Sequence, residues 1–144
     1  MSDKTRQRLP NRRRSWTQKV RIADANGAAQ TFYLTCGEYP DGRLGEIWIE
    51  AHKEGTLTRG VFGALARMAS ISLQCGANVA EVVNAMRHLD FPPNGTVEGS
   101  PAVARCSSIP DWIAQELAAA YLSPTTPEKV ARAGQEGNEG RVET

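Results

Sequence analysis

The residues of this chain best suited to bind a ligand lie between a predicted strand and a predicted helix. Over residues 52–59, HKEGTLTR, an imidazole, an ammonium group, two hydroxyls and a guanidinium lead into a helical pattern. Backbone amides at the start of a helix bind anions, and Arg pairs with phosphate. We therefore expect His52, Lys53, Thr56 and Arg59 to bind an anion, although the segment lacks the glycines and the Gly-Lys-Ser/Thr of a P-loop. An ordinary strand-to-helix connection explains the same spacing.

A second set of candidate residues lies in residues 91–105, FPPNGTVEGSPAVAR, which show no clear helix or strand pattern. Loops of this length in compact domains are often functional. Phe91 could stack on a planar ring, Asn94 could hydrogen-bond to one, and Arg105 could pair with a phosphate. A plain Pro/Gly linker is the alternative.

Positive charge is concentrated at the N-terminus. Residues 1–22 hold eight Lys and Arg against one acid, Asp3, whereas the whole chain has a formal net charge of only +1. Arg14, Lys19 and Arg21 could attract phosphate groups, so we add them to the candidate ligand-binding residues. A solvated arm explains the same run, and the small net charge argues against general binding of nucleic acids.

The sequence offers no set of side chains that predicts catalysis or a metal site. His52 stands near Glu50 and Glu54 but has no accompanying Ser or Cys nucleophile. The three cysteines and two histidines show neither C-x-x-C nor H-x-x-H spacing. We therefore expect no enzymatic activity, no metal and no cofactor.

The order of the predicted elements indicates an α+β fold. Alternating apolar residues predict strands over 17–22, 31–36 and 46–51. Three- and four-residue spacings predict a helix over 58–75, and Asn78 and Ser108 are suited to cap a second and a third. We expect a small antiparallel sheet of three or more strands followed by about three helices, in a single two-layer domain.

The chain of 144 residues fits one such domain. We expect a flexible basic arm over residues 1–15, the α+β domain over 16–122 and a disordered tail over 123–144. No apolar stretch is long enough to cross a bilayer and no signal-peptide pattern is present, so we expect a cytoplasmic protein. Trp48 should point outward from its strand, where it could form the interface of a homo-oligomer.

Five segments spread over the first 55 residues jointly resemble a known module: residues 9–13, 17–20, 31–34, 37–47 and 52–55. That module is the C-terminal TSCPD domain of adenosylcobalamin-dependent (class II) ribonucleotide reductases. The resemblance extends from about Leu9 to Leu122. The motif that names the family falls on residues 107–111, SSIPD, where Ile109 stands at the cysteine position. This departure argues against a thiol or metal role there.

The resemblance implies binding by this chain without catalysis. The catalytic barrel, radical cysteine and cobalamin-binding parts of the reductases do not fit in this chain, and no cysteine follows Leu122. Free-standing relatives include phage proteins, and anti-Thoeris proteins that oligomerise and hold cyclic signalling nucleotides look similar. We therefore expect a homo-oligomer, a dimer or higher, that binds a small phosphorylated nucleotide and sequesters it in the host cytoplasm if phage-encoded. The alternatives are an accessory subunit of a class II ribonucleotide reductase, and nucleic-acid binding through the basic arm.

Overall fold

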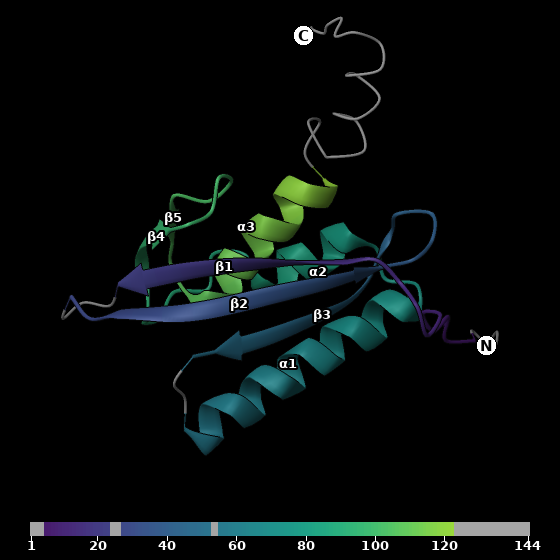
Figure 1. Ribbon diagram of the computed structural model, residues 1–144, viewed down its shortest axis with the longest axis horizontal. Coiled ribbons are helices and arrows are strands. Elements are labelled where there is room, and N and C mark those ends of the chain that lie inside the picture. The colour runs from purple at the N-terminus through teal and green to yellow at the C-terminus, as the bar shows by residue number, and fades with distance from the viewer. Residues whose placement is uncertain (1–4, 24–26, 53–54, 123–144) are drawn as a thin grey trace, which may run out of the picture.

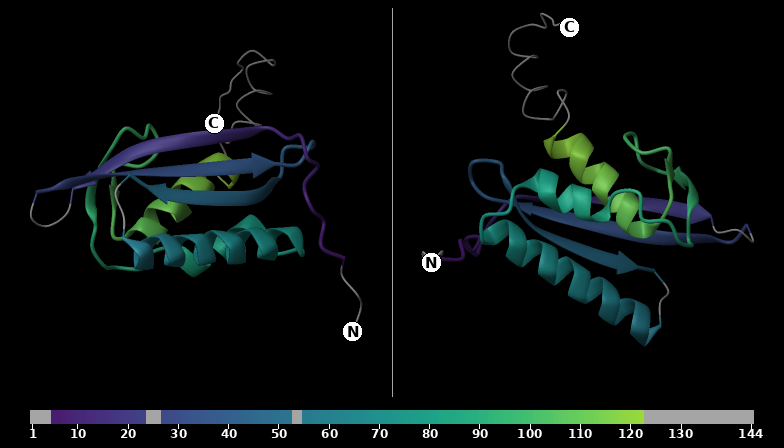
Figure 2. Two further views of the ribbon diagram at one scale, coloured as in Figure 1. Left: turned by 60° about the horizontal axis from the view of Figure 1, so that its bottom comes forward. Right: turned by 180° about the vertical axis from the view of Figure 1, so that it is seen from behind.

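The computed structural model describes residues 5–23, 27–52 and 55–122, which form a sheet with helices on one of its faces (Figure 1). The strands are β1 (Ser15–Ala23), β2 (Ala29–Glu38), β3 (Leu44–Ala51), β4 (Gly95–Glu98) and β5 (Arg105–Cys106). The helices are α1 (Thr56–Gln74), α2 (Val79–Met86) and α3 (Ile109–Tyr121). All paired strands are antiparallel, in the order β3-β2-β1-β4-β5. Figure 2 shows the two layers, which confirm the predicted α+β fold.

The last two strands are the main difference from the predicted order of elements. Residues 91–105, for which no regular structure was predicted, contain β4 and the first residue of β5, between α2 and α3. β4 joins the sheet where Ile22 pairs with Val97 and Arg21 with Glu98. Strands of four and two residues are too short to show an alternating pattern, which explains why the sequence did not reveal them.

Alternate residues of the long strands point into the core, as their patterns predicted. On β2 and β3, Phe32, Leu34, Ile47 and Ile49 are buried, whereas Trp48 is 57% exposed on the opposite face. Helix α3 lies at the centre of the helical layer and contributes the fully buried Trp112, Ile113 and Leu117. The outer face of the sheet carries no helix in the described part of the chain (Figure 2).

Helix α1 is held against the free edge of β3 by polar side chains. Ser70 Oγ lies 2.9 Å from the backbone N of Ile47 and 3.3 Å from its carbonyl oxygen. Gln74 Nε2 donates to the carbonyl of Gly45 at 2.9 Å. Unpaired backbone groups on an edge strand invite pairing with another chain. The side chains of α1 thus satisfy this part of the edge within the subunit.

Residues 5–14, part of the predicted basic arm, pack across the ends of α1 and β3. Gln7 N donates to the carbonyl of Gln74 at 2.8 Å, and Tyr39 Oη donates to the carbonyl of Gln7. Arg13 binds Glu46 through two hydrogen bonds of 2.9 and 3.1 Å. The flexibility of the arm stays a prediction, but these contacts define where the segment lies. Residues 123–144, the predicted disordered tail, lie outside the described residues.

The carboxylate of Asp111 connects the end of α2 to the start of α3. It accepts hydrogen bonds from His88 N at 2.7 Å, Ser107 N at 3.0 Å and Gln115 Nε2 at 2.9 Å. Ser108 Oγ accepts from Asp111 N at 3.0 Å and so caps α3 as predicted. His88 takes a left-handed conformation, with φ of 71°, and this turn directs its N–H to the carboxylate. One buried side chain thus sets the connection between two helices.

Asp111→Asn should lower the free energy of unfolding by about 1–3 kcal/mol at pH 7, because the new amide places its own NH₂ against backbone N–H donors. Burial raises the pKa of Asp111, but hydrogen bonds from His88 and Ser107 outweigh it and hold the pKa below its ordinary value. A carboxyl group of this kind stabilises the fold above its unfolded pKa of about 3.9, and that stabilisation is lost as the pH falls through the lower, folded pKa.

Urea denaturation at several pH values measures this effect. The difference between the parent chain and Asp111→Asn should shrink as the pH falls below about 4. Asp90→Asn is the matched control, since Asp90 is exposed and accepts only a 3.4 Å hydrogen bond from Asn94. A difference that stays constant from pH 7 to pH 2 would contradict this role.

Candidate functional site

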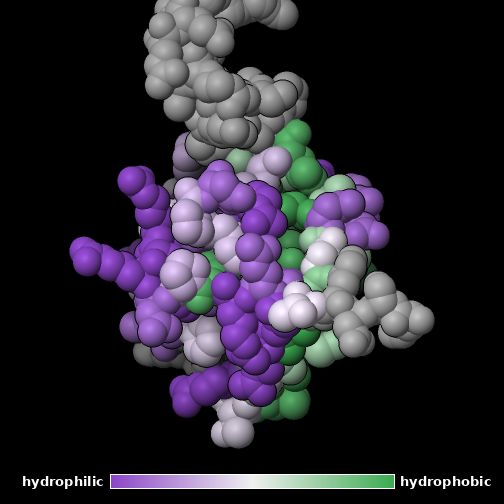
Figure 3. Space-filling view, turned by 90° about the vertical axis from the view of Figure 1, so that its right-hand side faces the viewer, coloured by the Kyte–Doolittle hydropathy of each residue, from purple (hydrophilic) through white to green (hydrophobic). Residues whose placement is uncertain are grey.

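A cavity of about 990 Å³ lies at the end of the molecule where β2 turns into β3. Figure 3 faces this end, where hydrophilic residues cross the surface beside a strip of hydrophobic ones. We call this the end cavity. It is large for a small-molecule site, since ligand pockets usually measure about 300–1,000 Å³. Its walls come from the first three strands and from the three helices with their connections: Trp16, Glu38, Asp41, Gly42, Arg43, Leu44, Leu73, Gly76, Ala77, Asn78, Val79, Ala80, Ala120, Tyr121 and Leu122.

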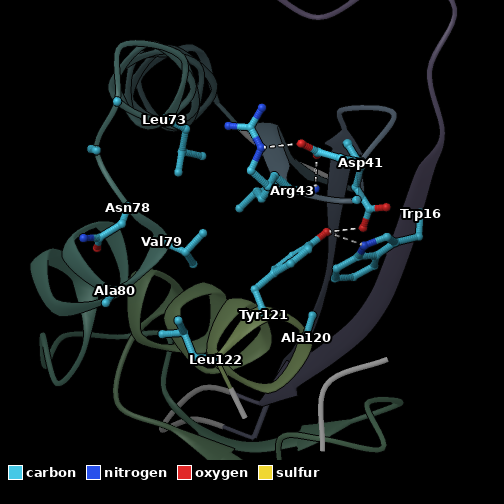
Figure 4. Close-up of a pocket in the computed structure, with 15 residues that line it drawn as sticks. Trp16, Asp41, Arg43, Leu73, Asn78, Val79, Ala80, Ala120, Tyr121 and Leu122 are labelled. Carbon is cyan, nitrogen blue, oxygen red and sulfur yellow. Dashed lines mark hydrogen bonds and ion pairs between the residues drawn. The ribbon is translucent and has the colours of Figure 1, made fainter. Parts of the chain in front are cut away.

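Three hydrogen-bonded side chains line one wall of the end cavity (Figure 4). Trp16 Nε1 donates to Tyr121 Oη at 2.9 Å, and Tyr121 Oη donates to a carboxylate oxygen of Glu38. The rings of Trp16 and Tyr121 stack with centroids 6.5 Å apart. Burial raises the pKa of Tyr121, and the hydrogen bond to Glu38 raises it further. Tyr121 therefore keeps its proton at neutral pH and donates a hydrogen bond to Glu38. These contacts join the end of α3 to β1 and β2.

A charged pair in the turn between β2 and β3 also lines the end cavity (Figure 4). Arg43 Nε lies 2.8 Å from Asp41 Oδ2, and the Arg43 guanidinium lies 4.6 Å from the ring centroid of Tyr39. Gly42, at a φ of 94°, permits the turn between the two strands. Both charged side chains are 57% exposed, so their pairing adds little stability but leaves Arg43 accessible to a ligand.

A second, shallower hollow lies between β3 and the first turns of α1, with a volume of about 530 Å³. We call it the β3–α1 pocket. It brings the predicted ligand residues His52 and Arg59 together with Tyr33, Trp48 and Glu50. Its other lining residues are Ile49, Ala51 and Gly63.

The start of α1, which carries the predicted ligand residue Thr56, lies beside this pocket. Gly55 precedes the helix without a side-chain cap, and the first turn carries no acidic residue, so its amides favour an anion. Thr56 is the exposed first residue of the helix. Lys53 lies outside the described residues.

Lys19 and Arg21 lie on the open face of the sheet, near the β3–α1 pocket. Lys19 pairs in register with Tyr33, which pairs with Glu50, and Lys19 Nζ lies 5.9 Å from the Tyr33 ring centroid. Arg21 lies opposite Glu98 on β4. Positive charges on this face therefore alternate with carboxylates and do not gather into a phosphate-binding cluster.

The remaining predicted ligand residues lie elsewhere. Arg105 is on β5, at the opposite edge of the sheet from β3, and four strand spacings separate these edges by about 19 Å. Arg105 Nη1 donates a hydrogen bond to Thr96 Oγ1 at 3.2 Å, and Asn94 Nδ2 donates one to Asp90 Oδ1 at 3.4 Å. Arg59, on α1 beside β3, and Arg105 therefore lie at opposite edges of the sheet, and a shared role in binding one ligand stays a prediction.

Phe91 and Arg14 are also separate from the β3–α1 pocket. Phe91 is 47% exposed, and its N–H donates to the carbonyl of Ser107 at 2.9 Å. The carbonyl of Arg14 accepts from Glu38 N at 2.9 Å, beside the start of β1. Roles for these residues in ligand binding stay predictions.

The sequence analysis did not assign the end-cavity residues Trp16, Glu38 and Tyr121 to a site. Glu38 lies in the segment 37–47 that carries the family resemblance, which was the one available signal. No spacing in the sequence joins residues 16, 38 and 121, because their contact depends on how α3 crosses the sheet.

The described residues contain no group of three or more His, Cys, Asp or Glu placed to hold a metal ion. Cys36 and Cys106 are buried, and burial raises the pKa of both thiols. Within the same ranges, no helix is long and apolar enough to cross a membrane.

Comparison with known proteins identifies the class to which this fold and site belong. Residues 4–121 match the model of the TSCPD domain, so the chain belongs to the TSCPD domain family. The name-giving motif of that family coincides with the Asp111 connection described above. Ile109, at the cysteine position, is 2% exposed and belongs to the hydrophobic core.

Relatives of this chain are vitamin B12-dependent ribonucleotide reductases. The identity is 40% over 117 residues with the protein of Agrobacterium fabrum and 39% over 118 residues with that of Bradyrhizobium diazoefficiens. With the protein of Rhodopirellula baltica it is 36% over 118 residues. These alignments cover 81–82% of this chain but only 9–11% of the relatives. No solved structure matches significantly.

Tyr121→Phe should lower the free energy of unfolding by about 1–2 kcal/mol at pH 7, because it removes the acceptor of Trp16 and the donor to Glu38. A tyrosine whose folded pKa is raised stabilises the fold below its unfolded pKa of about 10, and this stabilisation is lost as the pH rises toward the folded pKa. The difference between the parent chain and Tyr121→Phe, measured by urea denaturation, should therefore shrink above pH 10. Tyr33→Phe, on the open face, is the control and should change stability little.

Proposed function

We propose that this chain is a non-catalytic docking module whose open sheet face binds a vitamin B12-dependent ribonucleotide reductase chain. The relatives support the choice of a reductase as the partner, because they carry the matching segment inside a much longer reductase polypeptide. Trp48, which is 57% exposed on the edge strand β3 of an uncovered sheet face, is the structural observation that carries the proposal. Hydrophobic surface of this kind on a soluble domain marks interaction sites.

Three rows of side chains cross β1, β2 and β3 on this face: Thr17–Thr35–Trp48, Lys19–Tyr33–Glu50 and Arg21–Thr31–His52. Aromatic residues and Arg are the side chains that most often dominate binding energy in protein interfaces. The face carries charges of both signs, since Lys19 shares its row with Glu50 and Arg21 pairs with Glu98 of β4, and this mixture suits a protein surface of mixed charge. Glu50, in the middle row, disfavours a ligand that consists mainly of phosphate.

A docking role also agrees with the chemistry of the described residues. They hold no metal cluster, and their buried thiols have raised pKa values that disfavour the reactive thiolate. Tyr121 and Glu38 hydrogen-bond to each other and stabilise the fold. The proposal therefore assigns the chemistry to the partner and the recognition to this chain.

Binding can be measured by titrating the purified chain into the Agrobacterium fabrum reductase from which the 117 matched residues have been removed. We expect saturable binding, and Trp48→Ala should weaken it by about 2 kcal/mol or more, as for a central interface residue. Leu89→Ala is the matched control, because Leu89 is also exposed, at 44%, but lies between α2 and β4, outside the three strands of the open face and outside α1. Absence of binding, or an equal loss with both variants, would contradict the proposal.

A second candidate function is binding, and sequestering, of a small phosphorylated nucleotide, as anti-defence proteins do. The observation that favours it is the β3–α1 pocket, where Trp48 and Tyr33 offer ring surfaces beside His52, Arg59 and the uncapped start of α1. Bases stack on aromatic side chains, and helix amides with Arg bind phosphate. Glu50 in the same pocket weakens this candidate, unless it hydrogen-bonds to a ribose or base.

Calorimetric titration with cyclic dinucleotides, cyclic trinucleotides and ADP-ribose isomers tests this second candidate. If a nucleotide binds in the β3–α1 pocket, Arg59→Ala should weaken binding by about 1–3 kcal/mol, the range for a charge-assisted hydrogen bond. Arg105→Ala should leave it unchanged, because Arg105 lies at the far edge of the sheet. No heat and no thermal shift with any of these compounds would exclude the candidate.

A further inference from the structure

Helix α1 carries a second apolar stripe that faces away from the sheet. Its buried residues, Ala66, Ala69, Ser70, Leu73 and Gln74, belong to the inner face. Apolar residues spaced alternately by four and three positions follow the outer face: Leu57, Val61, Ala64, Met68, Ile71 and Cys75. We call this set the outer stripe. This spacing is the one that packs one helix along another.

Most of the outer stripe is exposed in the single subunit, and only Ile71 and Cys75 are half-buried. Leu57, Val61 and Met68 are 80%, 54% and 66% exposed. An amphipathic surface helix normally has one apolar face, which lies on the core, with polar residues opposite. Helix α1 instead carries apolar residues on both faces over its 19 residues, and only the inner face is covered within the described chain. We therefore expect another surface to cover the outer stripe.

We propose that a second copy of this chain covers the outer stripe, with the two α1 helices packed antiparallel about a two-fold axis near Ala64. In that arrangement Val61 of each copy lies opposite Met68 of the other, and Leu57 lies opposite Ile71. The small side chain of Ala64 at the centre allows the helix axes to approach to about 8 Å. A two-fold axis requires a self-complementary surface, and the outer stripe has this property.

Charge also favours a second copy in this orientation. The outer stripe has no charged residue, and α1 as a whole has only Arg59 and Arg67. Arg59 lines the β3–α1 pocket, away from the stripe. Antiparallel packing places Arg67 beside Gly60 of the other copy, where no atom lies within 4 Å of the position a Cβ would take.

The arrangement leaves the open sheet face accessible in both copies, because α1 lies in the helical layer and that face is on the other side of the sheet (Figure 2). The dimer would therefore carry two docking faces, and binding two linked sites on one partner gains avidity. The inference does not depend on the proposed function: it concerns a different surface and would stand if no reductase bound.

Sedimentation equilibrium of the full chain at about 1–100 µM tests the proposal, and we expect a dimer. Met68→Glu should raise the dimer dissociation constant on the order of 100-fold, because the interface would bury two unpaired carboxylates. Met68 is exposed in the subunit, so circular dichroism should show that the variant stays folded. Met68→Leu, which keeps an apolar side chain, should stay dimeric, as should Trp48→Glu on the open face.

Cysteine cross-linking tests the orientation. In a Cys75→Ala background, Ala64→Cys should form a disulfide between copies under mild oxidation, whereas Leu57→Cys should not. A monomeric parent chain, a dimer indifferent to Met68→Glu, or cross-linking through position 57 in place of 64 would each overturn the proposal. Loss of reductase binding by Met68→Glu in a chain that is monomeric would assign the stripe to that partner and overturn it too.

Discussion

The hydrogen bonds to the Asp111 carboxylate are the constraint on which most of this fold depends. They fix the left-handed turn at His88, the backbone at Ser107 and the first turn of α3 at one point. Helix α3 then carries Trp112, Ile113 and Leu117 into the centre of the core. Ten residues after Asp111, on the same helix, Tyr121 forms hydrogen bonds with Glu38 and Trp16 at the far end of the sheet. A change at Asp111 would therefore alter both the core and the end cavity.

The two faces of the sheet have different roles because only one of them is covered. The inner face packs on α3, and the edge of β3 is satisfied by Ser70 and Gln74 of α1. The outer face keeps Trp48, Tyr33 and alternating charges in contact with solvent. In a TSCPD domain that supplies about a tenth of its reductase relatives, such a face is suited to recognition.

Several features of the fold followed from the sequence because they depend on neighbouring residues. Asn78 and Ser108 cap α2 and α3, each accepting from an amide three residues on, as their spacing predicted. The alternation on β2 and β3 matches the structure, in which Phe32 and Ile47 are buried and Trp48 is exposed. The segment 37–47, which carried the family resemblance, forms one side of the end cavity. The short strands β4 and β5 escaped detection because two to four residues hold too few alternations.

The sequence by itself determined the local elements, their caps, the buried side of each long strand and the family. The elements, the caps and the burial pattern depend on residues within about four positions of each other, where periodicity carries the information, whereas the family was recognised from several segments together. Only the tertiary structure decided which distant residues meet. It joined Trp16 to Tyr121 across 105 positions, and it separated Arg105 from Arg59 by placing β5 and β3 at opposite edges. Strand order and helix crossing set those distances, and no local pattern encodes either of them.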